Sequence, residues 1–282
     1  MKSRIFVSVL LLSTTTFCLS QEKFPDPSPL QSIKQNFGLS SIEISYSRPS
    51  AKSRKMIGNI EPYDSVWRTG ANAASLITFG GSVNILGNTI LPGTYALYTI
   101  PGKEKWIVII NKGVKNWGSD HYRKEDDVCR FVIKPESISN YVETLRIQFE
   151  NVKAESCALE IAWENWQLAI PITTNIKDTL RAEIEESIKN RTPTYWYAAQ
   201  FYFEYDANPL KALDMINLAI STGEEKGMKP YWYYHYKARI LKQLKRNSEA
   251  KEAAQVSSRL AIEHGNRNNY IKLNQELINS LN

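Results

Sequence analysis

The side chains best suited to binding chemistry are concentrated in one stretch of the chain, Tyr46–Asn72. Arginine forks recognise carboxylate, phosphate or sulfate groups through paired hydrogen bonds, and the faces of tryptophan and tyrosine rings stack on sugars. A plain connecting loop needs neither group in such numbers. The stretch therefore predicts a polar and aromatic ligand site that holds no metal, built from Arg48, Arg54, Trp67, Arg68 and Asn72.

A structural role for the same residues remains an alternative at this stage. Arg48 and Arg68 can pair with carboxylates such as Asp64 or Asp126, while Trp67 fills the edge of a sheet. Two directions are therefore open for the arginines, outward to a ligand or inward to acidic partners.

A second group of functional side chains occupies the stretch WGSDHYRKEDD, Trp117–Asp127. Carboxylates with a histidine and a tyrosine can bind a cation, or act as acid and base around a sugar. The competing interpretation is a solvated loop between two strands. The candidate residues of this second loop are Asp120, His121, Tyr122 and Asp126.

Signatures of common enzymes are absent from the sequence. A three-histidine metal site would need every histidine of the chain, His121, His235 and His264. The motifs GxSxG and HExxH and the glycine-rich phosphate loop do not occur. We therefore expect no metal and no cofactor, assign no catalytic residue, and favour binding over catalysis.

The first twenty residues have the pattern of a secretory signal peptide. Lys2 and Arg4 precede the apolar run Ile5–Leu12, and small and polar residues follow. The run is shorter than the roughly twenty residues of a membrane span, so we expect export to the periplasm or the outside and no transmembrane segment. Removal of Lys2 and Arg4 lowers the formal charge from +6 to +4, which does not imply nucleic-acid binding.

The composition changes near residues 173–177, which divides the chain into a β half and an α half. We expect a signal peptide at 1–20, an N-terminal extension at 21–40, an antiparallel β-sandwich at 41–173 and a helical domain at 174–282. Short runs with period-two alternation, separated by glycine-rich turns, favour a two-sheet sandwich. The expected strands are Ile42–Tyr46, Ser75–Phe79, Ser82–Leu86, Tyr95–Ile100, Trp106–Asn111, Cys129–Lys134, Thr144–Glu150, Ala158–Glu164 and Gln167–Ile172.

The α half shows helical spacing and an internal repeat. Pairs of an N-cap residue and a proline, Thr192-Pro193 and Asn208-Pro209, predict two helix starts. Ala212 and Ala250 are 38 residues apart (250 − 212), and each follows an aromatic-rich helix. This period is near the roughly 34 residues of a tetratricopeptide repeat, so we expect tetratricopeptide-like helical hairpins that dock a protein partner.

Two cysteines remain beyond the leader, Cys129 and Cys157. Two cysteines do not make a disulfide framework, and we expect buried free thiols, with a single disulfide as the alternative.

Four phrases of the β half resemble a secreted bacterial family catalogued as domain of unknown function 2911: YSRPSAKSRKMIG, EPYDSVWRTGAN, LPGTYALYTIPGKEKWIVIIN and NWGSDHY. The resemblance spans about Pro27 to Ile172 and implies an exported all-β domain, but no activity. It adds Tyr98 to the candidate ligand-binding residues. The residues within its motifs are Arg48, Pro49, Ser50, Lys52, Arg54, Trp67, Arg68, Thr69, Gly70, Asn72, Tyr95, Tyr98, Pro101, Trp117, Gly118 and Tyr122.

These observations favour an exported binding module that recognises an anionic or carbohydrate-like ligand on the β domain and docks a partner through its helices. One alternative is a cell-envelope hydrolase of saccharide or ester, which would use Asp120, His121, Asp126 or a serine near Ser50. Another is a purely structural assembly factor, which would expose its large apolar patch on the helices alone.

Overall fold

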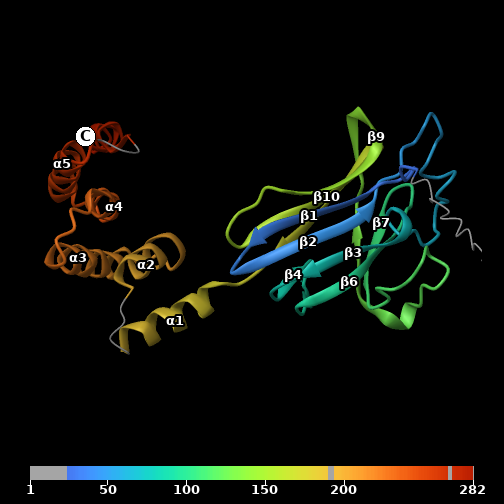
Figure 1. Ribbon diagram of the computed structural model, residues 1–282, viewed down its shortest axis with the longest axis horizontal. Helices are drawn as coiled ribbons and strands as arrows, with labels where there is room; N and C mark the ends of the chain where they lie inside the picture. Colours follow the sequence, from blue (N-terminus) through green and yellow to red (C-terminus); the bar gives the residue numbers. More distant parts are fainter. Residues whose placement is uncertain (1–23, 190–193, 266–268, 282) are drawn as a thin grey trace, which may run out of the picture.

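The computed structural model describes residues 24–189, 194–265 and 269–281. The expected signal peptide and the expected N-cap at Thr192 lie outside the described residues. Within them, none of the helices combines the length and the apolar character required to span a membrane. The chain forms a strand-rich half followed by a helical half, as the composition predicted (Figure 1).

The strand-rich half is a sandwich of two antiparallel sheets. One sheet has six strands in the order β1-β2-β3-β6-β7-β8, and the other has four in the order β5-β4-β10-β9. The strands are β1 (Leu30–Phe37), β2 (Ser40–Ser47), β3 (Ala71–Phe79), β4 (Val83–Ile85), β5 (Asn88–Ile90), β6 (Gly93–Ile100), β7 (Trp106–Asn111), β8 (Asp127–Ile133), β9 (Glu136–Glu150) and β10 (Ser156–Thr173).

The strands differ from expectation in four main places. The short strand β5, which pairs with β4, was not expected. The segment expected to precede the sandwich supplies β1, which pairs with β2 along its whole length. β9 begins eight residues earlier than expected (144 − 136). The two runs expected on either side of Asn165 form the single strand β10, which keeps its pairing with β9 through two register shifts. Bulges of this kind bend a strand without ending it.

The inner faces of the two sheets enclose one core of alternating apolar side chains, as strands of period two require. Trp67, Trp106 and Trp163 meet inside it. The ring of Trp67 stacks on that of Trp163, with centroids 5.7 Å apart, and meets the ring of Trp106 edge-on at 6.3 Å. A smaller apolar cluster lies on the other face of the six-stranded sheet and includes Tyr98 and Tyr122.

The helical half begins at α1 (Lys177–Lys189), which leads away from the sandwich in Figure 1. Its core is separate from that of the sandwich, and Ala212 and Ala250, the alanines of the predicted repeat, are fully buried in it. The later helices are α2 (Tyr195–Gln200), continued by the π-helical turn η2 (Phe201–Tyr205), then α3 (Pro209–Glu225), α4 (Tyr231–Gln243), α5 (Asn247–Glu263) and α6 (Tyr270–Asn279).

Candidate functional site

Residues 48–70, here called the closing segment, join the two sheets at one end of the sandwich. After β2 the chain pairs with β9, where the backbone N–H of Ala51 donates to the carbonyl of Glu143 at 2.9 Å. It then returns to the six-stranded sheet, where Trp67 and Thr99 exchange backbone hydrogen bonds of 2.7 and 2.9 Å. The stretch expected to be a ligand site therefore closes the edge of the sandwich.

A carboxylate on β10 holds the middle of the closing segment. The two oxygens of Glu164 accept the backbone N–H groups of Met56 and Ile57, each at 3.0 Å. A carboxylate that accepts backbone N–H groups forms charge-assisted hydrogen bonds, which are stronger than neutral ones. The segment is thus attached to both β9 and β10.

The arginines of the closing segment bind backbone carbonyl groups. The Nε of Arg48 donates to the carbonyl of Leu145 at 3.1 Å, and the Nε of Arg54 donates to that of Ala51 at 2.9 Å. The predicted inward pairing with Asp64 or Asp126 is not formed. The side chain of Asp126 pairs instead with Arg123, at 2.8 Å.

Trp67 and Tyr98 lie in the interior. Trp67 is 1% exposed, and its indole N–H donates to the carbonyl of Gly70 at 3.1 Å. Tyr98 has no exposed surface, and its hydroxyl accepts a hydrogen bond from the Nδ2 of Asn116 at 3.1 Å. Neither ring has a free face for a ligand, so we leave both out of the proposed site.

Arg68 and Asn72 connect the closing segment to the second loop. The carbonyl of Asn72 accepts hydrogen bonds from the Nη1 of Arg68 and from the backbone N–H of Gly118, both at 3.1 Å. Gly118 has a φ of +72°, and a Cβ there would lie 2.9 Å from the Nη1 of Arg68. Only glycine combines this backbone conformation with so close an approach.

Glu61 is a titratable group of the closing segment that the sequence did not single out. Burial raises the pKa of its carboxyl group to about 7, and the positive charge of Arg68 opposes this shift only in part. A carboxyl group that titrates near neutrality makes the stability of the closing segment sensitive to pH.

The second loop lines an open pocket of about 550 Å³, here called the loop cavity. All four candidate residues of that loop line it. The complete lining consists of Lys112, Gly113, Asn116, Asp120, His121, Tyr122, Arg123 and Asp126. The structure thus brings the second loop together as one site and separates it from the closing-segment arginines Arg48 and Arg54.

The wall of the loop cavity is supported from beneath by an aromatic and ionic cluster. Tyr122 packs edge-on against Tyr98 with ring centroids 5.1 Å apart, and its hydroxyl donates to Asp127 at 2.9 Å. Asp127 also pairs with Arg130. Burial and the neighbouring Asp127 raise the pKa of Tyr122 to about 12, so its hydroxyl keeps its proton at neutral pH.

The loop cavity presents both signs of charge. Arg123 and Asp126 neutralise each other, while the side chains of Lys112 and Asp120 form no ion pair within the part of the chain that the structure describes. Asn116 is held in place because its Nδ2 also donates to the carbonyl of His121, at 3.1 Å. Fixed donors and acceptors around one space suit a ligand with hydroxyl or acid groups.

Sequence reasoning missed four members of this site: Lys112, Gly113, Asn116 and Arg123. All of them lie within or just before the stretch that did attract attention. The polar run that begins at Lys112, directly after a strongly apolar strand, was the available signal.

Within the described ranges, no group of three histidine, cysteine or acidic side chains is placed to hold a metal ion. Cys129 and Cys157 are free thiols; Cys157 is buried, as expected, whereas Cys129 is only half-buried.

Comparison with known proteins gives one family. The family described as protein of unknown function (DUF2911) matches residues 28–172, which include the closing segment and the loop cavity. No curated protein and no solved structure matches the chain.

Proposed function

The chain belongs to the family described as protein of unknown function (DUF2911), and from the contents of the loop cavity we propose that its sandwich is a binding module for an anionic or carbohydrate-like ligand. The observation that carries the proposal is the gathering of eight lining residues, seven of them polar or charged, around a single space of about 550 Å³. Ligand sites are clefts of roughly 300–1,000 Å³ with a few fixed polar groups.

The unpaired charges indicate how a ligand would be held. Lys112 can receive an acidic group, and Asp120 can accept hydrogen bonds from sugar hydroxyls. The side chains of Tyr122 and Asn116 are already oriented by protein contacts. Both Nδ2 hydrogens of Asn116 are used in these contacts, which leaves its Oδ1 to accept from a ligand, and the site loses little side-chain entropy when it binds.

Thermal unfolding in the presence of small acids and neutral sugars tests this proposal. A ligand present at a hundred times its dissociation constant raises the free energy of unfolding by about 2.7 kcal/mol. We expect Lys112→Gln to weaken binding of acids, Asp120→Asn to weaken binding of sugars, and Lys103→Gln, on an exposed turn between β6 and β7, to change neither. Equal affinity of all three variants for every ligand would contradict the proposal.

A hydrolase of saccharide or ester is the second candidate function, because Asp120, His121 and Asp126 line the same cavity. It requires turnover, which Asp120→Asn and Asp126→Asn would abolish while binding remains measurable. Ser50 is not part of this candidate, because its hydroxyl pairs with that of Thr144 at 2.8 Å and does not line the cavity.

Docking of a protein partner through the helices and export from the cytoplasm complete the proposal. Exposed apolar side chains on the helices, such as Tyr197 and Leu210, support a docking role. Trp117 and Leu91 of the sandwich are equally exposed. This distribution does not favour a purely structural factor that acts through the helices alone.

Export is tested by N-terminal sequencing of the chain recovered outside the cytoplasm, with Gln21 as the expected first residue.

A further inference from the structure

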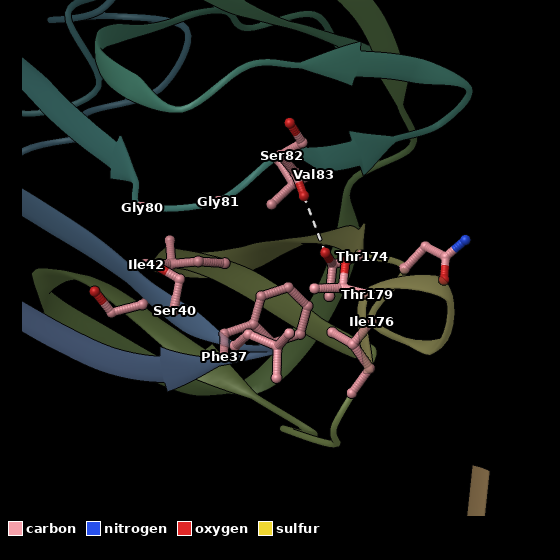
Figure 2. Close-up of a pocket in the computed structure, with 13 residues that line it drawn as sticks. Phe37, Ser40, Ile42, Gly80, Gly81, Ser82, Val83, Thr174, Ile176 and Thr179 are labelled. Carbon is pink, nitrogen blue, oxygen red and sulfur yellow. Dashed lines mark hydrogen bonds between the residues drawn. The ribbon is translucent and has the colours of Figure 1, made fainter. Parts of the chain in front are cut away.

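A second cavity, of about 420 Å³, lies where the sandwich passes into α1. Three segments that are far apart in the sequence meet there: residues 37–42 of the β1–β2 turn, residues 80–83 before β4, and residues 174–179 at the start of α1 (Figure 2). It shares no residue with the loop cavity. We call it the junction cavity.

The walls of the junction cavity are fixed by contacts between these segments. The hydroxyl of Thr174 donates to the carbonyl of Ser82 at 2.9 Å, the bond drawn in Figure 2. Gly38, at a φ of +59°, approaches so closely that a Cβ there would lie 2.9 Å from the Cγ2 of Thr174. The β1–β2 turn and the start of α1 are therefore held together without closing the space between them.

The lining of the junction cavity contains no charged side chain, although 23% of the chain is charged. Its apolar part includes Phe37, Ile42 and Val83, and its polar part is made mainly of hydroxyl groups and backbone. An uncharged lining disfavours ionic ligands, because an ion brought there would lose hydration without gaining a partner of opposite charge.

Four hydroxyl groups of the lining, those of Ser40, Ser41, Ser82 and Thr179, form no hydrogen bond within the described residues. Each can donate one hydrogen bond and accept two. Beside them, Gly80 and Gly81 have no side chain, which leaves their backbone accessible from the cavity. Free hydroxyls next to an apolar floor match a molecule that has hydroxyl groups on its edge and C–H groups on its face.

We propose that the junction cavity binds an uncharged, hydroxyl-bearing ligand of the saccharide type, and that the bound ligand links the sandwich to the first turn of α1. The ligand would contact the β1–β2 turn, the segment before β4 and Thr179 of α1 at once. This site is independent of the function proposed for the loop cavity.

Hydrogen exchange of the full-length chain, measured with and without sugars, tests the proposal. The probes are glucose, N-acetylglucosamine and their disaccharides, compared with anionic glucuronate and cationic glucosamine. We expect the neutral sugars to slow amide exchange in 37–42, 80–83 and 174–179, and the two charged sugars to bind at least about tenfold more weakly, a factor that corresponds to 1.4 kcal/mol.

Variants locate the effect. Ser82→Ala combined with Thr179→Val removes two of the free hydroxyls at nearly constant shape and should weaken binding about tenfold, as the loss of one or two hydrogen bonds predicts. Gly81→Leu gives independent evidence by filling the space, since a Cβ at Gly81 meets only the Cβ of Ser40, at 3.6 Å. Thr89→Val, an exposed threonine of β5 outside the cavity, is the matched control and should bind normally.

The pattern of protection shows which of the two cavities binds the sugar. Slower exchange at the three junction segments that disappears in Gly81→Leu supports the proposal. Protection by neutral sugars confined to residues 112–126 would overturn it while supporting the loop cavity as the ligand site. No protection at the junction segments at millimolar sugar, or tighter binding of glucuronate than of glucose there, would also overturn it.

Discussion

The carboxyl group of Glu61 is half-buried in the closing segment, and this partial loss of hydration raises its pKa from 4.5 to about 7. The native state therefore binds a proton more tightly than the unfolded chain does. The contribution of Glu61 to stability is greatest below pH 4.5 and is lost progressively as the pH rises towards 7.

We expect Glu61→Gln to remove the pH-dependent contribution of Glu61 to the free energy of unfolding. Urea unfolding of the variant and of the wild type, repeated from pH 4.5 to 7.5, should show the wild type losing stability relative to the variant as the pH rises. Glu104→Gln, on the exposed turn before β7, is the control and should run parallel to the wild type. A difference between wild type and Glu61→Gln that stays constant over this range would contradict the assignment.

The direction taken by the arginines shows the limit of inference from residue types. Arg48 and Arg54 bind the carbonyl groups of Leu145 and Ala51, and every residue of a chain offers such a carbonyl. A carboxylate partner can be recognised in the sequence as an aspartate or glutamate, whereas a backbone carbonyl belongs to every residue and cannot. The sequence therefore identified the segment as unusual without indicating that Arg48 and Arg54 bind backbone carbonyl groups.

At the scale of elements, helix α3 begins with a cap that the sequence predicted and the structure confirms. The side chain of Asn208 accepts the backbone N–H of Lys211 at 3.1 Å, and Pro209 follows at the first helical position. The cap satisfies one of the N–H groups that a helix start leaves without a partner.

Replacement of this cap should destabilise the helical half. We expect Asn208→Ala to cost about 1 kcal/mol of unfolding free energy, measured by urea denaturation followed by circular dichroism. Asn217→Ala, in the exposed middle of the same helix, provides the control, and it should be neutral or slightly stabilising because alanine favours helix more than asparagine does. Equal losses for both variants would show that the cap contributes nothing.

Central elements were easier to predict than edge elements. β7 matched its expected range because it lies between β6 and β8 and its apolar side chains are buried on both faces of the sheet. β1 was missed because an edge strand can be polar on both faces, and LQSIKQNF carries few apolar residues. β10 was predicted as two strands because Glu164 and Asn165 have the composition of a turn. The structure places Glu164 at a φ of +51°, and pairing with β9 continues on both sides of it.

At the scale of the whole molecule, each half has its own hydrophobic core. The core clusters of the sandwich draw on residues from Ile33 to Ile172, and the cluster of the helices draws on residues from Leu180 to Leu281. The two sets of core residues do not overlap, so the two halves can unfold separately.

We expect calorimetry of the full chain to show two thermal transitions. A fragment that ends at residue 174 should reproduce one of them, with the sandwich folded. A single transition in the full chain, at a temperature above that at which the fragment unfolds, would instead show that the halves stabilise each other.

The hydroxyl of Tyr46 exchanges hydrogen bonds with the backbone of Ile147, donating to its carbonyl at 3.1 Å and accepting from its N–H at 2.8 Å, across 101 positions of the chain. Contacts this distant in sequence form late, because a long loop must first be closed. The helical hairpins need only neighbouring residues. During synthesis the two sheets therefore cannot pack against each other until β9 has been made. The inner face of the first strands stays uncovered for longer than the apolar face of any helix. A factor that accompanies the growing chain would therefore meet the first sheet before the second sheet covers its inner face.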